Sequence, residues 1–281
     1  MLDAERMNTA VIDACTATAY FRESGTGTGV VCIHCNASSC SQWRPLMDRL
    51  APRHRVLAPD TYGAGRGPAW PGDRALTLRD EVAMLEPVFA RAGEPFVLIG
   101  HSYGAAVALL AALQQPERVR ALVLYEPTLF ALIDTASPVP NAADGIRQTV
   151  ALATAALARD DRGAAAQIFI DYWMGEGAWF AKPEAQRSAI EAAVVNVQGW
   201  SGALFGDTTP LAEFRALKMP ALLMQGAETT PSARAVALLL AGTLPRVETL
   251  TLRGLGHMGP VTNPEQVNEA IDGFLRRHFS P

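Results

Sequence analysis

One serine stands where the sequence predicts an abrupt turn from a strand into a helix. Four apolar residues, 96–99, lead into Gly-His-Ser-Tyr-Gly at 100–104, and an alanine- and leucine-rich stretch follows at 105–113. The unbroken apolar run predicts a strand buried on both faces, and the stretch after the motif predicts a helix. Such a turn strains the serine and leaves its hydroxyl exposed at the edge of the sheet. Ser102 is therefore the candidate nucleophile.

A serine hydroxyl needs a base that removes its proton and an acid that orients this base. His257 is the candidate base, because it lies in a glycine-flanked loop, 254–259, directly after a predicted strand. Such a loop lets the imidazole reach back over the end of the strand. The other four histidines lie in charged sequence or beside motifs: His34, His54, His101 and His278.

Predicted strands and helices alternate over much of the chain, which indicates a mostly parallel sheet covered by helices on both faces. The strands are expected at 17–22, 30–33, 55–58, 96–99, 119–124, 221–224 and 247–252. The helices around them are expected at 41–50, 78–92, 105–113, 232–241 and 264–279.

This alternation stops between residues 128 and 217, where three helices and no strand are expected. We therefore divide the chain into a core, 1–127 and 218–281, and a helical cap, 128–217. The cap contains seven notable aromatic residues, of which two or three are expected to face a pocket and the rest to fill the core of the cap. They are Phe169, Tyr172, Trp173, Trp179, Phe180, Trp200 and Phe205.

Composition narrows the possible partners. Hydrophobic residues make up 49% of the 281 residues, and the net charge is −4 without a basic run, which argues against nucleic acid and anionic membranes. No apolar stretch reaches transmembrane length, and the first nine residues lack a signal-peptide core. We expect a soluble, cytoplasmic protein that acts on a small molecule. Nothing in the sequence specifies or excludes a homodimer.

Two other patterns suggest metal or nucleotide chemistry, but each has a simpler structural explanation. Cys32 and Cys35 have C-x-x-C spacing, yet residues three apart on a strand point to opposite faces, so we predict buried free thiols. The glycine-rich stretch 25–29 precedes a strand rather than a helix, so we predict a turn and not a phosphate loop. No metal or other cofactor is expected.

Four segments resemble motifs of the α/β-hydrolase superfamily, and they occur in the family's order. They are His34 to Trp43, Asp60 to Arg66, Gly100 to Gly104 and Gly254 to His257. The resemblance covers nearly the whole chain apart from the cap. It implies an α/β-hydrolase fold, with an eight-stranded, mostly parallel sheet and a helical cap inserted after strand six. Asp60 is expected to be a structural residue of its turn.

The resemblance also implies an oxyanion hole formed by two backbone N–H groups, those of Tyr103 and Asn36. Tyr103 follows the nucleophile, and Asn36 matches the family's residue after His-Gly. Cys35 stands where the family usually has glycine. If that position requires a positive φ, the cysteine would be strained.

The acid has two candidates. The family usually places it in the loop after strand seven, but the residue at that position here is Thr229, and Glu228 lies one residue early. The other location known in the family, in some haloalkane dehalogenases, is the end of strand six, where this chain has Glu126. We favour Glu126, because its carboxylate would emerge at the same sheet edge as Ser102, and Glu228 is the alternative.

Together these residues predict a serine hydrolase that cleaves a carboxylic ester through an acyl-enzyme on Ser102. The aromatic cap favours a small to medium, largely apolar ester over a charged or polymeric one. Thioester, lactone and C–C bond hydrolysis by the same triad are alternatives. A different class, a non-catalytic ligand-binding homologue, would fail to react with a fluorophosphonate that labels active serines.

Overall fold

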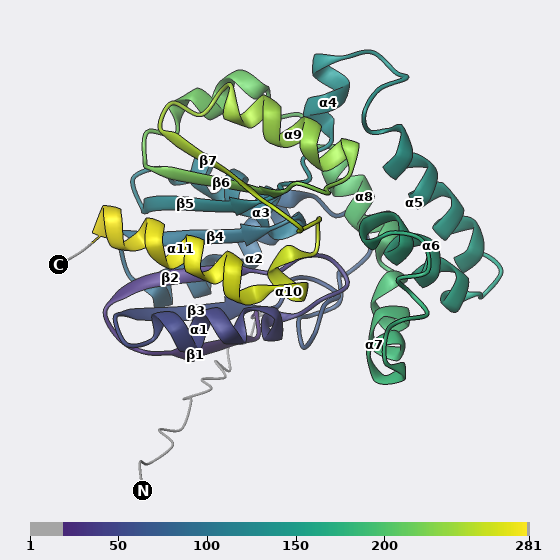
Figure 1. Cartoon of the computed structure of the whole chain (residues 1–281), viewed down its shortest axis with the longest axis horizontal. Coiled ribbons are helices and arrows are strands. Elements are labelled where there is room, and N and C mark those ends of the chain that lie inside the picture. Colours follow the sequence, from purple (N-terminus) through teal and green to yellow (C-terminus); the bar gives the residue numbers. More distant parts are fainter. Residues whose placement is uncertain (1–18, 280–281) are drawn as a thin grey trace, which may run out of the picture.

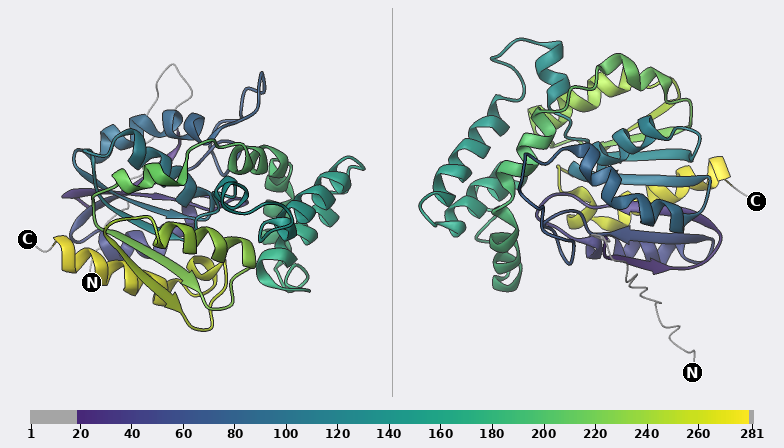
Figure 2. Two further views of the ribbon diagram at one scale, coloured as in Figure 1. Left: turned by 90° about the horizontal axis from the view of Figure 1, so that it is seen from above. Right: turned by 180° about the vertical axis from the view of Figure 1, so that it is seen from behind.

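The computed structural model describes residues 19–279, which form a seven-stranded sheet with helices on both faces (Figures 1 and 2). The strand order is β1-β3-β2-β4-β5-β6-β7; β1 pairs antiparallel with β3, and all other neighbours pair in parallel. The strands are β1 (Phe21–Ser24), β2 (Thr28–Ile33), β3 (His54–Pro59), β4 (Phe96–His101), β5 (Val119–Tyr125), β6 (Ala221–Gly226) and β7 (Val247–Leu252). The carboxyl ends of β2 to β7 therefore meet at one edge of the sheet.

The expectation of eight strands with an insertion after strand six is wrong for the described residues. They contain seven strands, and the helical insertion follows β5. The reason lies in the residues: only seven segments have a strand pattern, and the eighth was implied by the family resemblance. The first expected strand, 17–22, begins outside the described residues, and β1 covers Phe21–Ser24.

Side chains of successive strand residues enter two separate cores, one on each face of the sheet. On β4, Leu98 packs into the first core, whereas Val97 and Ile99 pack into the second. All six residues of β4 are buried, as the unbroken apolar run predicted. This burial on both faces requires a helical layer on each side.

Two helical layers cover the sheet. The first core is covered by α2 (Leu78–Ala92), α3 (Tyr103–Gln114) and α9 (Pro231–Ala241), and the second by α1 (Arg44–Leu50) and α11 (Pro264–Phe279). In Figure 1, α1 and α11 cross the front of the sheet, and Figure 2 shows the opposite face. Shorter elements are the 3-10 helices η1 (Cys40–Trp43) and η2 (Leu211–Ala216) and the helix α10 (Gly259–Thr262).

Within the described residues, the segment between β5 and β6 contains no strand; its regular elements are the helices α4 to α8 and then η2. These helices are α4 (Ala131–Ala136), α5 (Asp144–Leu157), α6 (Arg162–Met174), α7 (Glu184–Val194) and α8 (Val197–Phe205). Figure 1 shows α5, α6 and α7 beside the sheet rather than on either of its faces. The domain boundaries at 127/128 and 217/218 stay predictions. Within residues 19–279, no helix has the length and apolar character that crossing a membrane requires.

A buried carboxyl group supports the start of α3 from the neighbouring helix α2. Glu81 is fully buried and accepts hydrogen bonds from the hydroxyl of Tyr103 (3.0 Å) and the N–H of Tyr62 (3.1 Å). Burial raises the pKa of Glu81 from 4.5 to about 8, because the apolar surroundings disfavour the charged form. Between pH 4.5 and about pH 8, the folded protein therefore keeps a proton on Glu81 that the unfolded chain releases.

This proton predicts a pH-dependent effect of the substitution Glu81→Gln. A raised carboxyl pKa means that the stability of the wild type falls as pH rises from about 5 to about 8. An amide cannot ionise, so the substitution should remove this decrease. The free energy of unfolding of the variant, measured relative to that of the wild type, should therefore be higher at pH 9 than at pH 5 by on the order of a few kcal/mol. Urea unfolding at both pH values tests this. Parallel pH profiles for the two proteins would contradict it.

Candidate active site

Ser102 occupies a sharp turn between β4 and α3, with φ +56° and ψ −116°. Both flanking glycines are required by close backbone contacts. A Cβ at Gly100 would lie 2.5 Å from the carbonyl oxygen of Gly104, and a Cβ at Gly104 would lie 2.3 Å from the carbonyl oxygen of Ile33. The turn thus has the strained conformation that the sequence predicted, and it places the serine at the carboxyl edge of the sheet.

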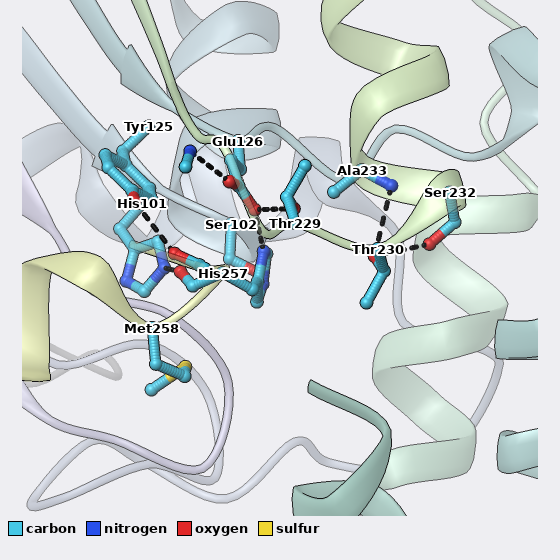
Figure 3. A network of polar contacts seen from close by, with 12 residues as sticks. His101, Ser102, Tyr125, Glu126, Thr229, Thr230, Ser232, Ala233, His257 and Met258 are labelled. Carbon is cyan, nitrogen blue, oxygen red and sulfur yellow. Dashed lines mark hydrogen bonds and ion pairs between the residues drawn. The ribbon is translucent and has the colours of Figure 1, made fainter. Parts of the chain in front are cut away.

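His257 connects Ser102 to Glu126 by two hydrogen bonds (Figure 3). Its Nε2 lies 2.9 Å from Ser102 Oγ, and its Nδ1 lies 2.6 Å from Glu126 Oε2. The three side chains are nearly inaccessible to solvent, with exposures of 5% for Ser102, 2% for His257 and 0% for Glu126. When Nδ1–H donates to the carboxylate, Nε2 is free to accept the proton of the serine hydroxyl. The arrangement can therefore perform base-assisted nucleophilic attack.

Glu126 is held by three donors, one at the end of β6 and two in the loops that follow β6 and β7. Besides His257, it accepts a hydrogen bond from the N–H of Gly226 (2.7 Å) and one from the hydroxyl of Thr229 (2.5 Å). Its backbone has φ +45°, which turns the chain sharply after β5. The structure brings Glu126 to His257, whereas Glu228 is exposed and makes no hydrogen bond to His257. Thr229, at the family's usual acid position, instead binds the acid.

The loop expected to complete the oxyanion hole lies against the same cavity. Asn36 lines the cavity together with Ser102, and Tyr103 is the first residue of α3, where an N–H has no partner within the helix. Cys35 does not have a positive φ, so the strain considered for it is not present; the positive φ in this loop belongs to Ala37 (+53°). The N–H of Cys35 donates a hydrogen bond to Gln42 Oε1 at 3.2 Å.

A chain of hydrogen bonds joins this loop to the backbone of His257. Gln42 Nε2 lies 3.1 Å from His101 Nδ1, and His101 Nε2 lies 2.8 Å from the carbonyl oxygen of His257. Because that carbonyl can only accept, Nε2 of His101 must carry the proton and Nδ1 must accept from Gln42. Burial lowers the pKa of His101 well below its usual range, so the ring is neutral. No role for Gln42 or His101 was predicted from the sequence.

A cavity of about 780 Å³ lies between the sheet edge and the cap and contains Ser102 and His257 in its wall. Three of the seven cap aromatics line it, namely Phe169, Trp173 and Trp200. Trp173, on α6, stacks on the imidazole of His257, with ring centroids 3.8 Å apart and planes inclined by 23°. The cap therefore covers the base directly, a contact that no local pattern in the sequence could reveal.

The described cysteines are buried free thiols, and Asp60 holds a turn by hydrogen bonds. Cys32, Cys35 and Cys40 are free and buried, whereas Cys15 lies outside the described residues. No cluster of three or more His, Cys, Asp or Glu side chains suitable for a metal occurs among residues 19–279. Asp60 accepts hydrogen bonds from the N–H groups of Cys40 (2.5 Å) and Arg66 (2.8 Å), which fixes the turn after β3.

Comparisons with known proteins show which family and which relatives this chain resembles. A model of the family described as "Alpha/beta hydrolase family" matches residues 30–270. The chain is 22% identical to (E)-2-((N-methylformamido)methylene)succinate hydrolase of Acinetobacter baylyi, covering 92% of this chain and 94% of that protein. It is 26% identical to a pimeloyl-[acyl-carrier protein] methyl ester esterase of Aeromonas hydrophila, covering 89% and 96%. A crystal structure of an alpha/beta hydrolase from Sphaerobacter thermophilus superposes with a TM-score of 0.71 at 26% identity, covering 93% and 96%.

The two hydrogen bonds of His101 predict the protonation state of its ring. We expect the ring to remain neutral, with its proton on Nε2, from pH 6.5, the usual pKa of histidine, up to pH 9, because burial lowers the pKa of His101 and the carbonyl of His257 requires a donor. Histidine-ring ¹⁵N spectra across this range, assigned with the variant His101→Gln, measure it. A His101 ring that takes up a second proton within this range would contradict the assigned hydrogen-bond directions.

Proposed function

The chain belongs to the alpha/beta hydrolase family, and from this premise we propose that it is a serine hydrolase of small to medium, largely apolar carboxylic esters. One observation carries the proposal: in the hydrogen-bonded series Ser102–His257–Glu126, the serine and the histidine line a cavity whose cap side is mainly apolar. Serine, imidazole and carboxylate in this order form the arrangement that activates a hydroxyl for acyl transfer. Ser102, His257 and Glu126 are the proposed catalytic residues.

The first half of the proposed reaction forms the acyl-enzyme. Ser102 Oγ attacks the ester carbonyl carbon while its proton passes to Nε2 of His257. The tetrahedral intermediate then collapses, the bond to the alcohol oxygen breaks, and His257 returns the proton to the departing alcohol. The proposed donors to the intermediate's oxyanion are the N–H groups of Tyr103 and Asn36.

The second half releases the acid. A water molecule gives a proton to His257 Nε2 as its oxygen attacks the acyl carbon, and the collapse of the second intermediate returns this proton to Ser102 Oγ. Throughout, the carboxylate of Glu126 keeps the proton of the imidazole on Nδ1, so that Nε2 faces the serine. Gly226 and Thr229 hold the carboxylate in the orientation that this role needs.

The cap supports the choice of an apolar substrate. Four aromatic residues of the cap line the cavity, since Phe130 joins Phe169, Trp173 and Trp200. The rest of its contribution to the wall is mainly aliphatic, and these residues are Ile146, Val150, Ile170, Ala189, Ile190, Ala192, Ala193, Val197 and Leu204. Burying an apolar chain against such a wall is favourable, at about 25 cal/mol per Å² of area removed from water. A cavity of about 780 Å³ is within the ordinary size range of small-molecule sites.

The assignment of the acid predicts different effects of two glutamate substitutions on the hydrolysis of p-nitrophenyl esters of graded acyl length. Glu126→Gln should lower kcat/KM by about 10³- to 10⁴-fold, because an amide no longer holds the proton of His257 on Nδ1. Glu228→Gln is the matched control and should stay within about twofold of wild type, because its side chain is exposed. Ser102→Ala should lose about 10⁴-fold or more. If the wild type cleaves no ester, the proposal is wrong. If Glu228→Gln loses the activity that Glu126→Gln keeps, the acid is Glu228.

Covalent labelling distinguishes an enzyme from a non-catalytic binding protein with the same fold. A fluorophosphonate should label folded wild type at Ser102, because the activated hydroxyl attacks phosphorus and expels fluoride. Ser102→Ala should not be labelled, and Glu126→Gln should react more slowly. Mass spectrometry of the labelled peptide checks the site. Folded wild type without a label would favour the binding protein.

A further inference from the structure

The cavity wall contains one cationic side chain, Lys182, and no side chain of opposite charge. None of the described residues that line the cavity is Asp, Glu or Arg. The ammonium of Lys182 makes no ion pair and no hydrogen bond with any described residue. The side chain is half-buried, and the loss of water around it lowers the pKa of Lys182 below its usual range. An ammonium in this state gains from an anionic partner, and none of residues 19–279 supplies one.

Lys182 belongs to a polar end of an otherwise apolar wall. It lies two residues before the start of α7, next to the N-cap residue Pro183, and Gln186, four residues further along the chain, also lines the cavity. The later cavity-lining residues of α7 are apolar: Ala189, Ile190, Ala192 and Ala193. At 1.5 Å of rise per residue, the face from Gln186 to Ala193 extends over about 10 Å. The cap therefore presents two hydrogen-bond donors at one end of an apolar surface.

A second unpartnered polar atom of the cavity wall lies close in sequence to the proposed acid. Thr128, two residues after Glu126, lines the cavity and is only 1% exposed, yet its hydroxyl has no hydrogen-bond partner among the described residues. A buried hydroxyl without a partner costs free energy unless a ligand or water satisfies it. From α5 to α8, the cavity-lining polar residues are Lys182, Gln186 and Ser201, and the other lining residues there are apolar.

We propose that the substrate is an ester whose apolar chain carries a carboxylate, and that Lys182, assisted by Gln186, binds this carboxylate while the ester group lies at Ser102. This proposal rests on the proposed ester hydrolysis and specifies its substrate class. It departs from the sequence-based expectation of an uncharged ester at one place only, the end of the chain beside Lys182. The rest of the cap wall is mainly apolar and still favours an apolar chain.

A carboxylate fits this subsite better than a phosphate. Lys182 contributes a single positive charge, which a carboxylate balances, whereas a phosphate monoester carries between about −1.5 and −2 at neutral pH. The choice of residue is also informative, because only two of the 24 basic residues, Lys182 and Lys218, are lysines. A flexible ammonium can follow a chain end of variable position, which a rigid guanidinium fork does less readily.

The test compares esters that differ only in charge. The acyl-side pairs are mono-p-nitrophenyl esters of adipic, suberic and sebacic acids, each set against the analogue with a terminal carboxamide. An alcohol-side pair, the butyrate esters of 6-hydroxyhexanoate and of its amide, is followed by pH-stat. Wild type should prefer the carboxylate in at least one pair by about tenfold in kcat/KM, mainly through KM, as expected for one charged hydrogen bond near solvent. Equal rates in every pair would overturn the proposal.

Four variants assign the preference to one side chain. Lys182→Met keeps the apolar stem and should equalise the two members of the preferred pair, Lys182→Glu should reverse the preference, and Lys182→Arg should retain it. Lys218→Met is the matched control, because that ammonium lies outside the cavity and donates to the carbonyl of Arg215. A general disturbance of the cap would lower the rates of both members together and leave their ratio unchanged. A carboxylate preference that persists in Lys182→Met would refute the role of Lys182.

Binding of suberate, measured by calorimetry, separates this proposal from the proposed function. Wild type should bind suberate, and Lys182→Met should bind it about tenfold more weakly or not at all. If wild type cleaves p-nitrophenyl acetate but shows neither the preference nor this binding difference, ester hydrolysis stands and the carboxylate subsite is wrong. If no ester is cleaved but suberate binding depends on Lys182, the subsite stands and the proposed reaction is wrong.

Discussion

The buried hydrogen bond between His257 and Glu126 depends on three adjacent strands ending at the same edge of the sheet. An almost fully buried imidazole and carboxylate are tolerated only when their polar atoms are satisfied. The donors come from different loops: Gly226 and Thr229 lie at and after the end of β6, and His257 lies after β7. Parallel pairing in the order β5-β6-β7 is what brings these loops together.

The same edge holds two residues in a conformation that non-glycine residues rarely adopt. Ser102 and Glu126 have φ values of +56° and +45°, and strain of this kind costs of order 1–3 kcal/mol per residue. Each is fixed by a hydrogen bond that extends the sheet beyond its strands. The N–H of Ser102 donates to Tyr125 O (2.9 Å), and the N–H of Glu126 donates to Met224 O (3.0 Å). The rigidity of the sheet thus maintains the strained geometry of the site.

The core and the cap contribute different properties to the cavity. The core supplies the groups that can exchange protons and form a covalent bond, at the ends of strands where their positions are fixed. The cap supplies the apolar wall, the indole of Trp173 on His257 and the ammonium of Lys182. A change in the cap is therefore expected to alter substrate choice and the shielding of the base, whereas the hydrogen bonds of Ser102, His257 and Glu126 arise within the core.

Features that depend on neighbours along the chain were accessible from the sequence. The elbow at Ser102, the glycines beside it and the helix 78–92 follow from backbone restrictions and from the period of apolar residues, which act over a few residues. The parallel architecture and its helical insertion follow from the order of such segments. The eight-stranded sheet was wrong for the described chain because the count came from the family pattern, not from an eighth segment of strand character.

Tertiary structure alone decided which groups meet. Glu126 and Glu228 were both possible partners of His257 on the sequence. Only the packing of the strand ends places Glu126 Oε2 2.6 Å from His257 Nδ1 and leaves Glu228 exposed. Glu126 and His257 are 131 positions apart in the chain. The stacking of Trp173 on His257 and the unpaired charge of Lys182 likewise depend on how the cap lies against the core. Periodicity specifies which face of an element is buried, but not which atoms of a distant element lie opposite, because that depends on the packing of the whole chain.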